Sequence, residues 1–242
     1  MTWSQILGVI AAMGVASIVQ SLSGFGFALM AVPLMSLSVD VRHAVVVSTI
    51  VAMGTTCVHA WKERAHADES VARRLVIASF VGMPIGLVAF VLVPQATMKI
   101  VLGVVVVAIT VLLHRGVSIP ADSRRHEWFL GGASGVLATS LSTNGPPLVF
   151  LLQARGMTPE EFRGTISRVF AVVNVVTLVM FLAAGEVHLD TVVLSLWVVP
   201  VVVVCTWFGY RLRPALDAAR FRAMVLALLL LSGISAIVTA LA

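Results

Sequence analysis

An uncharged run of 27 residues, 128–154, has arginines on both sides and a polar interruption in its middle. Arg124 and Arg125 precede the run, Arg155 follows it, and residues 140–147 interrupt it with the sequence SLSTNGPP. A straight membrane helix separates a positive loop from a less positive one, whereas both loops here carry the charge of a cytoplasmic loop. We therefore expect this segment to enter the membrane, break at its polar centre and leave by the same face.

A break of this kind indicates a functional site. Backbone that is not helical is tolerated at membrane depth only where protein buries it or where it lines a water-filled cavity. The polar centre of segment 128–153 is therefore a candidate solute site.

The composition is that of a membrane protein. Of 242 residues, 60% are hydrophobic and 11% are charged, and the mean hydropathy is +1.06. The net charge of +5 lies mostly in the expected loops, so it indicates orientation and contact with lipid headgroups. Nucleic-acid binding would need a clustered basic face, which the chain lacks. We expect an all-α polytopic membrane protein with a single transmembrane domain, 1–242.

Eight apolar segments approach or exceed the length needed to cross a bilayer. They lie at about 3–38, 43–61, 75–93, 96–113, 128–153, 164–184, 191–208 and 221–241. As one helix, the first would be about 54 Å long, against a hydrocarbon core of about 30 Å. It must tilt, break or fold back, and the glycines and serines of residues 21–26, SLSGFG, predict a break.

The two interrupted segments match each other. Residues 21–26, SLSGFG, align with residues 140–145, SLSTNG, and further along Gly86 aligns with Gly209. The order of segments, one broken segment followed by three helices, also occurs twice. These matches predict an internal duplication.

We expect repeats at about 1–114 and 124–242, each made of one hairpin and three crossing helices. The first segment carries no charge that would test its direction, so its folding back from the opposite face is inferred from the repeat. The two repeats would then be inverted. Broken helices at matching places in two halves indicate a transporter's binding site near the bilayer midplane.

The distribution of lysine and arginine supports folding back of 128–153. If all segments cross once, these residues divide almost evenly between the two faces. If 128–153 folds back, only Arg42 and Lys99 lie on one face, and Arg168 lies within a helix. We predict that the opposite face is the cytoplasmic face of a cell (inner) membrane. This face then carries Lys62, Arg64, Arg73, Arg74, Arg115, Arg124, Arg125, Arg155, Arg163, Arg211, Arg213, Arg220 and Arg222.

The residues at the two breaks suit a small anion. Helix N-termini present free N–H groups and a partial positive charge, and proline fits the first helical turn. We expect one half-helix to open at Phe25 or Gly26 and the other at Pro146 or Pro147. The candidate substrate-binding residues are Ser21, Ser23, Gly24, Phe25, Gly26, Ser140, Ser142, Thr143, Asn144, Gly145 and Pro146, with Arg168 as an auxiliary positive charge.

Each of these residues also has a structural interpretation. The small residues at the breaks could serve only close helix packing, as we expect for Gly82 and Gly86. Arg168 could extend to the membrane surface instead of the site. Thr56, Asn174 and Thr177 are expected to form hydrogen bonds between helices.

Enzymatic chemistry is not expected. Gly132, Ser134 and Gly135 resemble the Gly-x-Ser-Gly of rhomboid intramembrane proteases, but no histidine is suitably placed as the base. No cluster of histidine, cysteine and carboxylate has metal-ligand spacing, and no Walker-type phosphate loop occurs. We therefore predict neither a bound cofactor nor a metal.

The sequence resembles the sulfite exporter TauE/SafE family of membrane permeases over essentially its whole length. The resemblance rests on residues 23–28, SGFGFA, running into Pro33, on residues 142–147, STNGPP, on the Gly82 and Gly86 pair, and on the duplicated layout. It implies about eight membrane segments and transport, often export, of sulfite, sulfonates and related sulfur or carboxylate anions. The second tip departs from the first, with Thr143 and Asn144 where the first has glycine and phenylalanine.

We therefore expect a secondary transporter, and specifically an exporter, of small sulfur-containing or organic anions. An anion channel with the same site, or a membrane subunit that only anchors a partner, are the alternatives. The expected partners are the anion and membrane lipids. The sequence leaves open the exact anion, the direction, the coupling ion, the dominant tip and the oligomeric state, for which a homodimer is one option.

Overall fold

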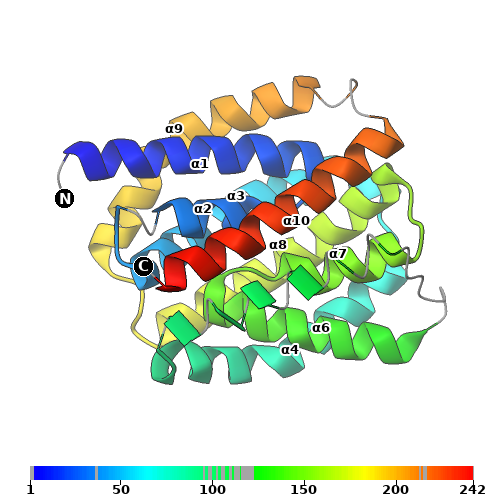
Figure 1. Cartoon of the computed structure of the whole chain (residues 1–242), viewed down its shortest axis with the longest axis horizontal. Helices are drawn as coiled ribbons and strands as arrows, with labels where there is room; N and C mark the ends of the chain where they lie inside the picture. Colours follow the sequence, from blue (N-terminus) through cyan, green and yellow to red (C-terminus); the bar gives the residue numbers. More distant parts are fainter. Residues whose placement is uncertain are drawn as a thin grey trace.

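The computed structural model describes residues 3–35, 38–94, 123–212, 214 and 217–241, together with single positions between 96 and 115. The described residues form mainly α-helices (Figure 1), with a short 3-10 helix at Arg64–His66. The helices are α1 (Trp3–Ser23), α2 (Phe27–Met35), α3 (Val41–Lys62), α4 (Glu69–Leu92), α6 (Arg124–Leu141), α7 (Gly145–Ala154), α8 (Pro159–Ala183), α9 (Leu189–Leu212) and α10 (Ala218–Leu241). Half of the residues of the expected segment 96–113 lie outside the described residues.

Five of these helices are long and apolar enough to cross a membrane: α1 from Gln5 onward, α3, α4, α8 and α9. The helices α2 and α7, with 9 and 10 residues, are only about 14 and 15 Å long and cannot cross alone. The all-α membrane fold is therefore confirmed. The number of eight segments stays a prediction.

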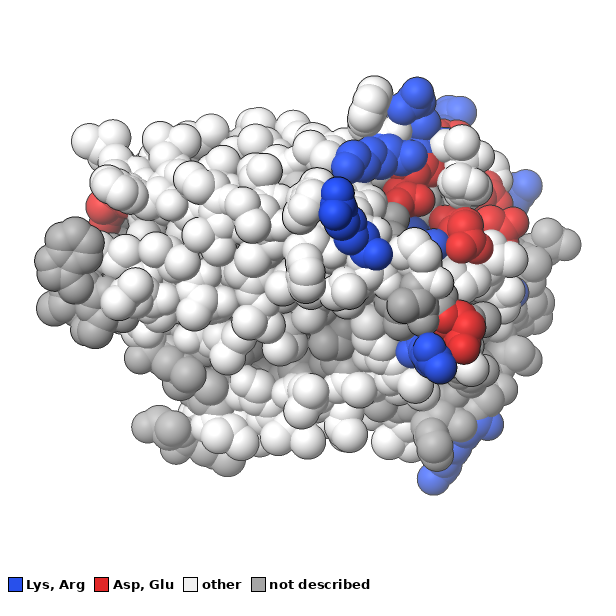
Figure 2. Space-filling view, turned by 90° about the horizontal axis from the view of Figure 1, so that it is seen from above, with Lys and Arg blue, Asp and Glu red and all other residues white. Residues whose placement is uncertain are grey.

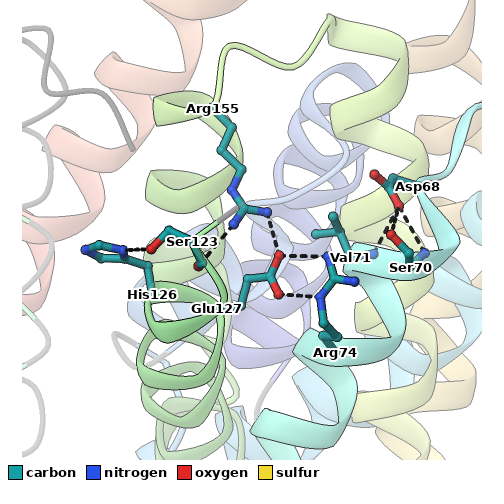
Figure 3. A network of polar contacts seen from close by, with 8 residues as sticks. All are labelled: Asp68, Ser70, Val71, Arg74, Ser123, His126, Glu127 and Arg155. Atoms are coloured by element: carbon teal, nitrogen blue, oxygen red, sulfur yellow. Dashed lines mark hydrogen bonds and ion pairs between the residues drawn. The ribbon is translucent and has the colours of Figure 1, made fainter. Parts of the chain in front are cut away.

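The segment 128–153 is broken and folded back. α6 ends at Leu141, α7 begins at Gly145, and Figure 1 shows α7 returning beside α6. Arg155, directly after α7, lies 2.7 Å from the carboxylate of Glu127 in the first turn of α6, and Arg74 of α4 binds the same carboxylate (Figure 3). The two ends of this hairpin are thus tied together at one end of the bundle.

The first segment is broken in the same way. α1 ends at Ser23, α2 begins at Phe27, and α2 packs against α1 on its way back (Figure 1). Ser38, just beyond α2, lies beside Gly8 in α1, where a Cβ on the glycine would be 2.6 Å from the Ser38 hydroxyl. The end of this hairpin therefore also returns close to its start.

The two hairpins open toward opposite ends of the bundle. α3 starts just after the first hairpin and runs about 33 Å to Lys62, close to the start of α4. Arg74, near the start of α4, binds Glu127 at the mouth of the second hairpin. On the face seen in Figure 2, lysine and arginine side chains gather at one end of the molecule.

Glycines bring the long helix of the second hairpin close to α4. A Cβ on Gly82 would lie 2.0 Å from the carbonyl oxygen of Gly132, and one on Gly135 would lie 1.9 Å from that of Ser79. Only hydrogen fits at these positions, so the expected packing role of Gly82 is confirmed. Gly86 likewise faces α6, because a Cβ there would lie 2.1 Å from the Val136 carbonyl oxygen.

Asp68 caps the N-terminus of α4 beside the Glu127 cluster. Its carboxylate accepts hydrogen bonds from the N–H groups of Ser70 and Val71, both at 3.0 Å. Burial raises the pKa of Asp68, but these hydrogen bonds and the charge of Arg74 outweigh it and hold the pKa below its ordinary value. The stabilisation from this cap is therefore present at neutral pH and is lost as the pH falls through the lowered pKa.

Replacing Glu127 by glutamine should destabilise the second hairpin. The Glu127 and Arg155 side chains are 1% and 3% exposed, so the substitution leaves a buried guanidinium without its counter-charge. We expect E127Q to lower the free energy of unfolding in detergent by about 3 kcal/mol. The matched control is E69Q, which breaks the exposed pair with Arg168 and should cost less than about 1 kcal/mol. Equal effects of the two variants would contradict the role assigned to Glu127.

Candidate functional site

The first break consists of one residue between two glycines in left-handed conformation. Gly24 has φ 81° and Gly26 has φ 89°, values that other residues rarely adopt. The Ser23 hydroxyl accepts a hydrogen bond from the Phe25 N–H at 3.2 Å, and it lies 2.6 Å from the Phe25 carbonyl oxygen. This serine therefore supplies the backbone partners that the broken helix lacks.

The break leaves the first N–H groups of α2 without partners in the helix. The first hydrogen bond of this helix runs from the Met30 N–H to the Gly26 carbonyl oxygen at 3.1 Å. The N–H groups of Phe27, Ala28 and Leu29 precede it and have no partner within the helix. They carry the partial positive charge of the helix end.

At the second break, hydroxyl groups from several residues form the hydrogen bonds that stabilise the turn. Ser142 adopts the left-handed region, with φ 54°, and its hydroxyl accepts a hydrogen bond from Thr49 of α3 at 2.9 Å. Thr143 donates from its hydroxyl to the Leu141 carbonyl oxygen at 2.9 Å. Ser134 donates to the Asn144 carbonyl oxygen at 2.8 Å, while the buried side-chain nitrogen Nδ2 of Asn144 has no hydrogen-bond partner among the described residues.

α7 offers fewer backbone donors than α2. Its first residue is Gly145, so Pro146 and Pro147 occupy the second and third positions instead of opening the helix. Proline has no N–H, and the orphan donors of this helix end are reduced accordingly. The expectation of free N–H groups at both tips therefore holds fully only for α2, and the second tip contributes the Asn144 amide.

The two breaks meet at one small buried cavity of about 20 Å³. The first hairpin lines it with Gln20, Gly26, Phe27, Ala28 and Leu29, and the second lines it with Ser142, Thr143, Asn144 and Gly145. The hairpins also touch, because a Cβ on Gly145 would lie 3.5 Å from the Phe25 ring. None of the described residues that line it is charged, so any attraction they have for an anion comes from helix ends and neutral donors.

Helices α3 and α8 complete the wall of the cavity with Ala52 and Thr56 on one side and Phe170 and Asn174 on the other. Asn174 donates from Nδ2 to the Thr56 hydroxyl at 3.3 Å. The predicted hydrogen bond between helices is thus confirmed for this pair, but both residues also face the cavity, which we did not predict. Thr177 differs, since its buried hydroxyl has no hydrogen-bond partner among the described residues.

Gln20 is a lining residue that the sequence analysis missed. It is 2% exposed, and its side-chain oxygen Oε1 has no hydrogen-bond partner among the described residues. The sequence did hold a signal for it, because Gln20 is an amide deep inside an apolar segment, one residue before the SLSGFG motif. Polar side chains in membrane helices are costly and are commonly functional.

Several predicted residues lie outside the cavity lining. The Ser21 hydroxyl donates to the Ser17 carbonyl oxygen at 2.8 Å, and Phe25 packs against Phe162 with ring centroids 6.0 Å apart. Gly24 lies against Arg163 of α8. The remaining residues outside the lining are Ser23, Ser140, Pro146 and Arg168.

Arg168 is placed on the surface of the bundle. Its guanidinium lies 2.8 Å from the Glu69 carboxylate, and the two side chains are 44% and 59% exposed. In this conformation Arg168 faces the N-terminus of α4, and it is not among the residues that line the cavity. The surface interpretation of Arg168 therefore agrees with the geometry better than an auxiliary binding role does.

The chain matches a known protein family over nearly its whole length. The family model described as "Sulfite exporter TauE/SafE" matches residues 9–236, which is nearly the whole chain. The chain belongs to the sulfite exporter TauE/SafE family. The resemblance seen in the motifs is therefore confirmed, and membership in this family of membrane transporters accounts for the helical, apolar architecture as that of a multi-pass membrane protein.

One curated relative of this TauE/SafE protein aligns with nearly its whole length. It is 27% identical over 248 residues, covering 95% of this chain and 93% of the relative, and it is named "Probable sulfite/organosulfonate exporter TauE" from Cupriavidus necator. No solved structure matches the chain.

The glycines of the first break should resist substitution. Alanine at Gly24 or Gly26 must adopt a left-handed φ, and at Gly24 its Cβ would also lie 3.2 Å from the Arg163 backbone. We expect G24A and G26A each to lower stability by about 1–2 kcal/mol, measured by thermal unfolding in detergent. G54A is the control: a Cβ at this exposed position in α3 meets nothing within 4 Å, so the variant should be neutral or up to about 1 kcal/mol more stable. Unchanged stability of both tip variants would contradict the assigned backbone geometry.

Proposed function

We propose that this protein is a secondary transporter that exports small sulfur-containing or organic anions, such as sulfite or sulfonates, across the inner membrane. The observation that carries the proposal is the meeting of both helix breaks at one buried cavity. Membership in the TauE/SafE family and the name of the Cupriavidus relative support the substrate class.

Recognition of the anion rests on N–H groups without a partner in their own helix and on an amide without a partner among the described residues. Phe27, Ala28 and Leu29 line the cavity at the N-terminus of α2, and Asn144, whose Nδ2 atom is unpaired among the described residues, lines it from the second hairpin. Helix N-termini bind sulfate-like and carboxylate groups through such N–H groups and the helix dipole. A neutral site of this kind holds an anion without the strong attraction of a buried cation, which favours release.

The described conformation suits an occluded state. A cavity of about 20 Å³ holds about one water molecule and must enlarge to admit a sulfonate. Along α8, the cavity residues Phe170 and Asn174 lie between two buried aromatic contacts. Phe162 packs on Phe25 toward the basic end, and Phe181 packs on Phe90 toward the other, with centroids 6.0 and 4.9 Å apart. We assign these contacts as inner and outer gates.

As inverted repeats, the two halves would alternate between two conformations around this site. Each hairpin's long helix packs on the third segment of the other half, α6 on α4 and α1 on α9. The aligned glycines make equivalent contacts, because Gly86 lies against Val136 of α6 and Gly209 lies against Ile18 of α1. Rocking of one half against the other then opens the cavity alternately to the two faces.

Export needs no additional energy source in this scheme. The basic end of the bundle is assigned to the cytoplasm by the distribution of positive charge. An anion leaving a negative-inside cell gains about 2.3 kcal/mol per charge per 100 mV. A uniporter would therefore already act as an exporter.

The direct test is counterflow in proteoliposomes that contain only this chain. Labelled sulfite or sulfoacetate should exchange against the unlabelled anion with saturable kinetics. N144A should raise the KM roughly tenfold to hundredfold, because hydrogen bonds to charged groups contribute about 1.5–3 kcal/mol. S140A is the matched control, since the Ser140 hydroxyl is buried without a described partner and does not line the cavity.

The result separates the alternatives. Large single-channel currents without counterflow would identify an anion channel. No binding of either anion by folded protein would favour a membrane subunit that only anchors a partner. Normal exchange by N144A would remove Asn144 from the site while leaving transport established.

A further inference from the structure

A long groove between α3 and α9 lies on the side of α3 away from the central cavity. Its volume is about 510 Å³, and its walls are largely apolar, with Gly54 of α3 leaving space in the middle. Along α9 it extends from Val192 to Tyr210, about 27 Å, which is close to the thickness of the hydrocarbon core. The groove therefore faces the acyl chains of the bilayer over most of its length.

One end of the groove is basic and aromatic. Lys62, which lines the groove, places its Nζ atom 4.0 Å from the centroid of the Tyr210 ring and so bridges the ends of α3 and α9. Arg211 stacks over Trp207 at 4.0 Å, and Arg64 lies over Trp61 at 4.9 Å. Aromatic side chains with adjacent cations are typical of the membrane–water interface.

These cations have no acidic partner among the described residues. Elsewhere on the bundle, Arg74 and Arg155 bind Glu127, and Arg168 binds Glu69. Lys62 and Arg211 instead lie over aromatic rings. An uncompensated pair of cations at the basic end of an apolar groove is complementary to a molecule with an anionic head and an apolar tail.

We propose that this groove binds an anionic phospholipid from the cytoplasmic leaflet. The phosphate lies between Lys62 and Arg211, and an acyl chain follows α9 past Gly54. The Tyr210 and Trp207 rings fix the two cations at the height of the headgroup. Basic sites between membrane helices on the cytoplasmic side bind anionic headgroups in this way. This site is independent of the central cavity and of the transported anion.

The test is native mass spectrometry of the delipidated full chain with added phosphatidylglycerol or phosphatidylcholine of equal chain length. The wild type should retain one phosphatidylglycerol in preference to phosphatidylcholine. The double variant K62Q/R211Q should bind phosphatidylglycerol about 25-fold more weakly, since each basic residue near an anionic lipid contributes about fivefold. R73Q, which removes an exposed cation of α4 that does not line the groove, is the matched control and should bind as the wild type does.

A second variant, G54F, tests whether an acyl chain occupies the apolar length of the groove. A side chain at Gly54 points into open space, so G54F should fold normally and reduce binding of both lipids by filling the groove. Thermal unfolding of each variant checks that the fold is retained. The proposal is overturned if both lipids bind equally well to the wild type, or if K62Q/R211Q retains full affinity. It is also overturned if a wild-type dimer is observed and G54F converts it to a monomer, which would assign the groove to a second copy of the chain.

Discussion

The need to satisfy backbone groups inside a membrane controls this structure. A helix that stops at membrane depth leaves N–H and C=O groups that lipid cannot bind. At the first break the Ser23 hydroxyl takes over both groups of Phe25. At the second, hydroxyls from Ser134, Thr143 and Thr49 hold the turn. Among the described residues, the first N–H groups of α2 have no partner within their helix and the Asn144 Nδ2 atom has no hydrogen-bond partner, and both line a common cavity.

The rest of the bundle keeps those two breaks together. Glycines on α4 and α6 allow the backbones of these two helices to touch, which fixes the second hairpin against α4. The Glu127 carboxylate, bound by Arg74 and Arg155, joins the two ends of that hairpin to α4 (Figure 3). α3 and α8 then close the cavity with Thr56 and Asn174. A polar, uncharged site can therefore exist inside an apolar bundle.

The absence of charge from the cavity lining has a consequence for transport. A buried arginine would hold an oxyanion strongly and would itself need a counter-charge when the anion left. In the function proposed above, a helix N-terminus and an amide would hold the same ligand with fixed dipoles that need no counter-charge in the empty state. Such a site would suit a carrier that must bind and release within one cycle, and it would need no contribution from Arg168, which is paired with Glu69 at the surface.

The sequence by itself determined the membrane class, the family, the two breaks and the folding back of 128–153, because these depend on local properties. Hydropathy, glycine and proline positions and the arginines around a neutral run all act over a few residues. Only the tertiary structure decided which polar residues share the cavity. Gln20 and Asn174 were brought to it by the depth and rotation of their helices, and Ser21 and Ser140 were turned away by the same factors. Helix rotation is set by contacts between segments distant in sequence, such as Gly135 with Ser79, and no local pattern encodes them.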